Sequence, residues 1–309
     1  MRHESSIYII TSCLIKDLNS NTNIFRINAL RTLSLILDSS NLIQIERYIK
    51  SALTDKNNSI ADAALVAAIH LYDSNKEIVK KWSNEVSEKL KPAYENCPFH
   101  SLILLYEIKK ADLAWFKKIL FVMAREDHKQ LATLQIIRFV KQILNKEELD
   151  SNTEKALVDF LNREVLSCED MVVIEACKAL CELKNISNQE LSNAISSLSV
   201  FLMSNSSVNK FAALKILNKV ISNPARASLL SNTSEIENLI SDNNRSLSCM
   251  AISILLKICK ESQVDKLLDQ IFEYITEISD EFKIDIINSM NILYRKWPSK
   301  HKVYNFAKI

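Results

Sequence analysis

The chain contains no glycine in its 309 residues. Loops that cradle phosphates or dinucleotides, and the sharp turn that presents a nucleophilic serine, use glycine to reach positive φ or to let a ligand approach the backbone. Tight β-hairpins and many β-bulges depend on glycine as well. The missing glycine therefore excludes the enzyme classes built on such loops and predicts a helical protein.

Short clusters rich in Asn and Ser stand where glycine would otherwise separate helices. They lie at residues 19–21, 57–59, 205–207 and 243–244. Asn is the second choice for the left-handed residue that ends a helix, and Ser or Asn is a preferred N-cap of the next helix. Each cluster therefore predicts the end of one helix and the beginning of another.

The charge balance is close to neutral, with 39 Lys and Arg against 37 Asp and Glu. A groove that neutralises nucleic-acid phosphates needs a larger positive excess, so we expect no nucleic-acid partner. No run of 18 apolar residues occurs, and the stretch at 7–15 fits an amphipathic helix better than a signal segment, so any membrane association should be peripheral. Seven irregularly spaced cysteines indicate reduced thiols in a cytosolic compartment.

Apolar residues recur at helical spacing along nearly the whole chain, interrupted by polar clusters and by four prolines. We predict about sixteen or seventeen helices. They are expected at 5–18, 24–37, 41–53, 60–72, 77–90, 99–109, 113–124, 130–144, 153–166, 170–183, 189–203, 208–221, 235–240, 245–260, 264–275 and 281–296, with a short piece after Pro298.

A small residue followed four positions later by an aliphatic one recurs in the second helix of successive pairs. The small residues are Ala29, Ala64, Ser101, Ala176, Ala213 and Ala251, at steps of 35, 37, 75, 37 and 38 residues. The step of 75 holds two periods, with the missing unit near Ile136. Such a unit predicts an all-α fold, a right-handed α-solenoid of HEAT/armadillo-like helix pairs with about eight repeats over residues 1–309.

The terminal repeats of a solenoid expose an apolar face unless something caps them. The chain ends on YNFAKI, which is not a polar cap. We therefore expect the chain to be a piece of a longer solenoid, or a partner to cover its ends.

No grouping of residues predicts catalysis, a cofactor or a metal. Cys177 and Cys181 lie one helical turn apart and Cys168 precedes them, but no His or CxxC lies nearby, so core packing is favoured over a zinc site. His70 and His100 lie in apolar stretches and are expected to be packed or hydrogen-bonded. We predict that the protein is not an enzyme.

One basic and aromatic cluster stands out, with Lys at 109–110 and 117–118 around Trp115 and Phe116. It could contact lipid headgroups or an acidic partner. A solvated helix edge, with lysine stems lying over the aromatic rings, is the favoured interpretation.

Four stretches resemble the trunks of coatomer gamma subunits, which belong to the COPI vesicle coat. They are IERYIKSALTDKNNSIADAALVAAIHL at 45–71, EDMVVIEACKAL at 169–180, ISDNNRSLSCMAISILLKICKES at 240–262 and EISDEFKIDIINSM at 277–290. Helix order and length run parallel between them, so the resemblance spans essentially the whole chain. It implies an adaptin-type trunk, of which this chain is a fragment without the appendage domain.

The resemblance also implies a non-enzymatic scaffold for Golgi-to-ER and intra-Golgi retrograde transport. Its partners would be the small zeta subunit and other coatomer subunits, together with a GTP-bound Arf-family GTPase that docks on the early helices. The protein would be cytoplasmic and peripheral on the Golgi membrane and COPI-coated vesicles. Preference for the GTP state would follow if the trunk contacts switch loops that only the γ-phosphate orders.

The resemblance places partner contacts without fixing them by motif. For the GTPase we predict residues on the first repeats, namely Arg47, Tyr48 and Lys50. For the zeta subunit we predict residues along the concave helices, namely Asn244, Arg245 and Lys283. The alternatives are a packed Tyr48, a solvated Arg47 and an ordinary first-turn Arg245.

Two other classes remain open at this point. One is a different HEAT-type scaffold, such as a nuclear transport receptor or a phosphatase scaffold, because fold alone does not separate these functions. The other is an enzyme on a similar solenoid, for example a DNA glycosylase, which would need a continuous basic groove and a catalytic carboxylate. The near-neutral charge argues against the glycosylase.

Overall fold

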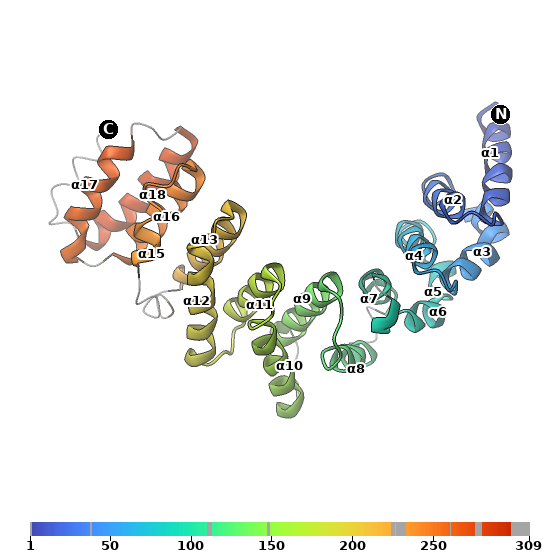
Figure 1. Cartoon of the computed structure of the whole chain (residues 1–309), viewed down its shortest axis with the longest axis horizontal. Helices are drawn as coiled ribbons and strands as arrows, with labels where there is room; N and C mark the ends of the chain where they lie inside the picture. Colours follow the sequence, from blue (N-terminus) through green and yellow to red (C-terminus); the bar gives the residue numbers. More distant parts are fainter. Residues whose placement is uncertain are drawn as a thin grey trace. The chain divides into compact units, whose positions relative to one another are not determined.

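The computed structural model describes residues 2–37, 39–94, 96–109, 113–146, 149–223, 226, 233–259, 261–275 and 280–297. Within these ranges every regular element is a helix and none is a strand (Figure 1). The helical class predicted from the missing glycine and the hydrophobic period is confirmed. None of the helices in these ranges is both long enough and apolar enough to cross a membrane.

The helices follow the predicted order closely. Their bounds are α1 Arg2–Leu18, α2 Asn23–Ile36, α3 Ser39–Leu53, α4 Asn58–Tyr72, α5 Lys76–Lys80, α6 Ser83–Glu88, η1 Pro92–Tyr94, α7 Cys97–Ile108, α8 Leu113–Met123, α9 Gln130–Lys146, α10 Ser151–Glu164, α11 Asp170–Glu182, α12 Asn188–Leu202, α13 Ser207–Ile221, α15 Ser234–Glu237, α16 Arg245–Ile258, η2 Glu261–Gln263, α17 Val264–Ile275 and α18 Asp280–Lys296. Contacts divide them into two compact units, Met1–Ile143 with Leu149–Thr153 and Leu144–Glu148 with Glu154–Ile309.

In the first unit the second helices of successive pairs pack on one another. Helix α2 packs on α4 and α4 packs on α7, while α3 packs against α4 and α6 (Figure 1). Ala29, Ala64 and Ser101 are at most 1% exposed at these packing faces. Ile136, at the position of the missing unit, is buried in α9. The small residues therefore lie where close helix crossing needs them.

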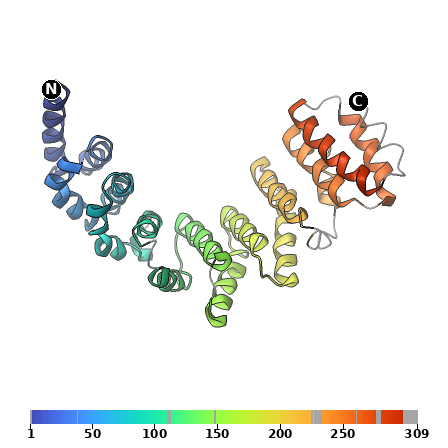
Figure 2. The same ribbon diagram turned by 180° about the vertical axis from the view of Figure 1, so that it is seen from behind.

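In the second unit α11, α13, α16 and α18 form the corresponding series. Helix α11 packs on α13, α13 on α16 and α16 on α18, and α12 packs against both α11 and α13 (Figure 2). Ala176, Ala213 and Ala251 are completely buried. The small-residue pattern read from the sequence thus marks the tightly packed helices in this unit as well.

The helix predicted at 77–90 is wrong, because the structure divides it into α5 and α6. Trp82 lies at the break with its side chain completely buried. Its indole Nε1 donates a hydrogen bond of 3.1 Å to Glu46 Oε1 on α3. This anchor on another helix overrides the local period, because the buried indole N–H requires an acceptor. The helix predicted at 235–240 is likewise shorter, and the piece after Pro298 and the YNFAKI end lie outside the described residues.

Three of the four Asn and Ser clusters begin helices as predicted. The cluster at 19–21 lies between α1 and α2, but the N-cap of α2 is Thr22, which forms no side-chain cap hydrogen bond. Asn57 caps α4 by accepting from Ser59 N, Ser206 caps α13, and Asn244 caps α16 by accepting from Ser246 N. Each side-chain oxygen satisfies a backbone N–H that the first helical turn leaves without a partner. These caps fix where α4, α13 and α16 start.

Candidate interaction surfaces

Within each unit, polar side chains link neighbouring helix pairs at nearly the spacing of the sequence repeat. The linked atoms are Tyr72 Oη with Glu107 O (2.7 Å), Trp82 Nε1 with Glu46 Oε1 (3.1 Å), Gln142 Nε2 with Tyr106 Oη (2.5 Å), Lys219 Nζ with Glu182 Oε1 (2.8 Å), Lys257 Nζ with Asn218 Oδ1 (2.8 Å) and Ser253 Oγ with Ser289 Oγ (3.0 Å). The paired residues are 35 to 39 positions apart. These contacts fix the register between neighbouring repeats.

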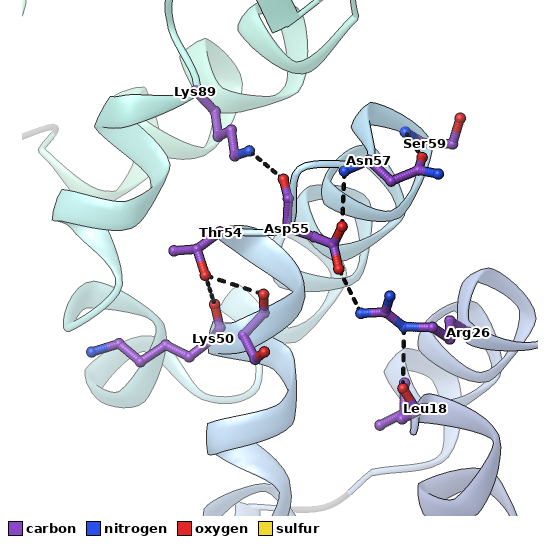
Figure 3. A network of polar contacts seen from close by, with 9 residues as sticks. Leu18, Arg26, Lys50, Thr54, Asp55, Asn57, Ser59 and Lys89 are labelled. Atoms are coloured by element: carbon purple, nitrogen blue, oxygen red, sulfur yellow. Dashed lines mark hydrogen bonds and ion pairs between the residues drawn. The ribbon is translucent and has the colours of Figure 1, made fainter. Parts of the chain in front are cut away.

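Asp55, between α3 and α4, is the centre of the polar network in Figure 3. Its Oδ1 accepts from Asn57 N at 2.8 Å and its Oδ2 from Arg26 Nη2 at 2.6 Å. Lys89 Nζ donates to the Asp55 carbonyl at 2.8 Å. Burial alone would raise the pKa of Asp55, but the Asn57 N–H and the Arg26 guanidinium outweigh it and lower the pKa.

Each of the two cations of this network, Arg26 and Lys89, makes a second contact. Arg26 Nε donates to Leu18 O, at the end of α1, at 3.2 Å. Lys89 is 4% exposed, and its Nζ lies 4.3 Å from the centre of the Tyr94 ring. The network therefore joins α1, α2, the α3–α4 connection and the end of α6. It acts as a structural joint, since its one carboxylate and both of its cations are engaged in contacts inside the protein.

The second unit repeats the joint at Asp242, before α16. Asp242 Oδ1 accepts from Asn244 N at 2.9 Å and its Oδ2 from Lys210 Nζ at 3.1 Å. Its carbonyl accepts from Ser248 Oγ at 2.9 Å. The Asn244 N–H and Lys210 together lower the pKa of Asp242.

Sequence reasoning missed both joints, although a signal for them exists. Residues 55–59 and 242–246 share the pattern Asp-x-Asn-x-Ser. In each case the fourth residue of an earlier helix supplies the cation, Arg26 in α2 and Lys210 in α13. The pattern together with that basic position identifies the joint.

The first predicted partner set lies on α3. Arg47 is exposed, its Nη2 donates to Tyr48 Oη at 2.6 Å, and its guanidinium lies 4.6 Å from the centre of the Tyr48 ring. Lys50 Nζ forms an ion pair of 2.8 Å with Glu85 Oε1 on α6, and the Glu85 hydrogen bond raises the pKa of Lys50. The structure thus brings Arg47 and Tyr48 together and turns Lys50 toward a structural contact.

The second predicted set lies on α16 and α18, which pack together. Asn244 Oδ1 accepts from Ser246 N at 3.1 Å, so this acceptor serves the cap of α16. Arg245 is exposed on the first turn of α16, and Lys283 is half-buried on α18. Arg245 offers the more accessible charge of the set.

The cysteines and histidines singled out in the sequence lie in different environments. Cys177 and Cys181 are buried, which raises the pKa of each thiol to about 12, so the core interpretation is confirmed for these two. It is wrong for Cys168, which is exposed in the connection between α10 and α11. His100 Nδ1 lies 2.6 Å from Asp62 Oδ1, as expected for a hydrogen-bonded histidine. The expectation for His70 is wrong, because it is exposed in the last turn of α4.

The basic and aromatic cluster is described in part. Lys109 Nζ lies 5.6 Å from the centre of the Trp115 ring, in agreement with a lysine stem over an aromatic ring. Lys118 is exposed on α8. Lys110 and the side chain of Phe116 lie outside the described part of the chain.

A cavity of about 300 Å³ lies beside the end of α11 in the second unit. Arg226 lines it and donates from Nη1 to Cys181 O and from Nη2 to Leu183 O, both at 2.6 Å. These bonds satisfy carbonyls that the helix end would leave without donors. Lys219 on the cavity wall is paired with Glu182 at 2.8 Å. The main cations of the cavity are therefore engaged in holding the fold.

Comparison with known proteins relates the whole arrangement to coat subunits. The family description "Adaptin N terminal region" matches residues 2–306. Coatomer subunit gamma-2 of Oryza sativa subsp. japonica is 39% identical over 298 residues, which cover 96% of this chain and 33% of the relative. Coatomer subunit gamma of Arabidopsis thaliana is 38% identical and coatomer subunit gamma-2 of Homo sapiens 36% identical, each over 96% of this chain and 34% of the relative. The chain spans about a third of the length of these relatives.

Proposed function

We propose that this chain, which belongs to the family of adaptin N-terminal regions, is the trunk of a gamma subunit of the COPI vesicle coat. The observation that carries the proposal is the 39% identity with a coatomer gamma subunit along 96% of the chain. The chain would serve as a non-enzymatic scaffold with other coatomer subunits at the Golgi membrane, in Golgi-to-ER and intra-Golgi retrograde transport.

The polar links between repeats support a scaffold role. Hydrogen bonds such as Tyr72 Oη to Glu107 O and Lys257 Nζ to Asn218 Oδ1 fix one helix pair on the next. A scaffold of this kind presents partner surfaces with little change on binding, which lowers the entropic cost of association.

Within that function we propose that a GTP-bound Arf-family GTPase docks on the first repeats. Arg47 and Tyr48 are the candidate contacts, because the exposed guanidinium lies over the ring and both side chains meet on α3. Arg and Tyr are enriched among residues that dominate binding energy at interfaces. Dependence on GTP follows if the contact needs switch loops that the γ-phosphate orders.

The zeta subunit is the second proposed partner, with Arg245 and Lys283 as its candidate contacts. Asn244 belongs to the same set, but its cap of α16 makes it a poor site for a test, since its replacement would also destabilise the helix. A charge-removing double variant, Arg245→Ala with Lys283→Ala, tests this surface.

Binding assays on the purified chain separate these proposals. We expect retention by immobilised zeta subunit and by Arf loaded with a non-hydrolysable GTP analogue, but not by Arf with GDP. Arg47→Ala should weaken GTPase binding by about tenfold, the effect of an interface contact worth roughly 1.4 kcal/mol. Arg163→Ala is the matched control, because Arg163 also lies over an aromatic ring, that of Phe160, but in the second unit. Binding of neither zeta nor Arf would refute the coat function and favour another scaffold of the same fold.

A further inference from the structure

We propose that the turns of the α10–α11 and α12–α13 pairs form a docking site for an amphipathic helix with a basic flank. The site consists of Leu166, Met171, Met203 and Val208, here named the apolar edge. These side chains are 84%, 58%, 68% and 74% exposed, respectively. None of them belongs to the surfaces proposed above for the GTPase or the zeta subunit, so the inference goes beyond the coat function and does not rest on it.

The apolar edge consists of two equivalent residue pairs: Leu166 and Met171 at the α10–α11 turn, and Met203 and Val208 at the α12–α13 turn. Leu166 and Met203 lie 37 residues apart, and so do Met171 and Val208. This is the step between Ala176 and Ala213, which mark the tightly packed α11 and α13. Each helix pair therefore presents one large apolar residue at the end of its first helix and one at the start of its second.

A hydrogen bond holds the two pairs next to each other. Asn209 Nδ2 on α13 donates to Asp170 Oδ2 on α11 at 2.8 Å. Asp170 directly precedes Met171, and Asn209 directly follows Val208. The starts of α11 and α13 are thus joined side by side at the residues that flank the apolar edge.

Such a cluster differs from ordinary surface composition. Single exposed apolar residues are common on soluble proteins and need no explanation. Several large ones gathered at equivalent positions of adjoining helix pairs are typical of an interaction surface. Methionine at two of the four positions suits a helix partner, because its flexible thioether adapts to varied apolar shapes.

The spacing favours a helix as the occupant. Packed helices such as α11 and α13 lie about 8 to 10 Å apart. A helix rises about 1.5 Å per residue, so residues seven positions apart are separated by about 10.5 Å. A helix laid across α11 and α13 can therefore place residue i on one pair of the apolar edge and residue i+7 on the other.

The charge beside the apolar edge favours basic residues on that helix. Glu169 and Asp170 are both exposed immediately before Met171. Asp170 accepts its hydrogen bond from the neutral amide of Asn209, so this contact does not compensate the negative charge of the Asp170 carboxylate. The nearby cation of Lys210 is paired with Asp242 at 3.1 Å. Lysine or arginine at one end of the docked helix would complement these two carboxylates.

A synthetic peptide tests the site in the full chain. The probe is a helix-forming peptide of about 18 residues, roughly 27 Å long, with leucines at i, i+4, i+7 and i+11 and lysines flanking one end. We expect fluorescence anisotropy to show saturable binding, weakened at least about tenfold by Met203→Ser with Val208→Ser. Ile43→Ser is the matched control, because Ile43 is 64% exposed on α3 in the other unit, and it should leave binding unchanged.

Cys168 supplies a second readout, because it is exposed between Leu166 and Met171. The peptide should slow alkylation of Cys168 while leaving that of Cys13, the exposed cysteine of α1, unchanged. A peptide with glutamates in place of the lysines should bind at least about tenfold more weakly.

Three results would overturn the proposal. They are equal binding of the glutamate peptide, equal protection of both cysteines, and unchanged binding by the Met203→Ser, Val208→Ser variant. In a fourth outcome, the unchanged chain does not bind the peptide but self-associates, and the Met203→Ser, Val208→Ser variant no longer self-associates. This outcome would also overturn the proposal, and would assign the apolar edge to contact between copies of the chain. Circular dichroism of the variant should match the unchanged chain, since both replaced side chains are exposed.

Discussion

Replacing Asp55 with alanine removes the carboxylate on which the joint of the first unit depends. Arg26 Nη2 and Asn57 N both lose their acceptor, at 2.6 Å and 2.8 Å in the intact protein. The Lys89 contact survives in part, because it is made to the backbone carbonyl. The change therefore tests the carboxylate without removing the buried lysine.

The magnitude follows from the two lost hydrogen bonds. A hydrogen bond to a charged group contributes about 1.5 to 3 kcal/mol, and the lower end applies because water can partly replace the partners. The side chains of Arg26 and Asp55 are 23% and 19% exposed. The bond from the uncharged donor Asn57 N to the same carboxylate adds about 1 kcal/mol. We expect a loss of about 2.5 kcal/mol, or roughly seventyfold in the local opening equilibrium.

Hydrogen exchange followed by mass spectrometry is the suitable assay, because the chain has two compact units and a single global unfolding transition is not assured. Amides at the start of α4 should lose protection in Asp55→Ala, while those of α16 should not change. Asp55→Asn should cost less, about 1.5 kcal/mol, since its oxygen still accepts from Asn57 N. Asp159→Ala, at an exposed position of α10, is the control.

The same joint predicts a pH dependence. The pKa of Asp55 is lower in the folded protein than in the unfolded chain, so its contribution is complete above the unfolded value of about 3.9. That contribution is lost as the pH falls from there through the folded-state pKa. Asp55→Asn should lack this part of the acid sensitivity.

Equal exchange rates at the start of α4 in Asp55→Ala and Asp159→Ala would refute the reasoning that the Asp55 carboxylate stabilises this joint.

Further predictions concern the core. Cys13 and Cys168 should react with iodoacetamide at pH 8, while Cys177 and Cys181 stay unmodified. Burial raises the pKa of the Cys177 and Cys181 thiols to about 12, so few of them are ionised at that pH. Peptide mass mapping checks this, and fast labelling of either buried thiol would contradict it. Ala213→Leu should destabilise the second unit by about 3 kcal/mol or more through overpacking between α13 and its neighbours. Hydrogen exchange of the α13 amides measures this loss, and a loss below about 1 kcal/mol would show that the crossing is not tight.

Much of the fold was predictable because its signals are local. The helical period, the caps at Asn57 and Asn244 and the buried Ala213 each depend on residues within one helix or its connection. The break at Trp82 was not predictable in this way, because its cause is Glu46, which lies 36 residues earlier. The exposed His70 illustrates the same limit, since an apolar stretch does not say which face of the helix is covered.

The candidate contact residues were harder to predict than the fold. Lys50 looked available in the sequence, but its ammonium group forms an ion pair with Glu85 on another helix. Arg47 could be described only once its guanidinium was placed over Tyr48. Side chains that bind partners and side chains that bind the next repeat have the same chemistry, so separating them needs the packing of both helices.

At Asp55 and Asp242 the carboxylate accepts the backbone N–H two residues later, and this bond closes the turn that leads into the capping Asn. The second carboxylate oxygen then binds a cation from an earlier helix, Arg26 or Lys210. Turn formation and repeat stacking are therefore coupled through one side chain, so loosening either joint should disturb the start of the following helix and its register together.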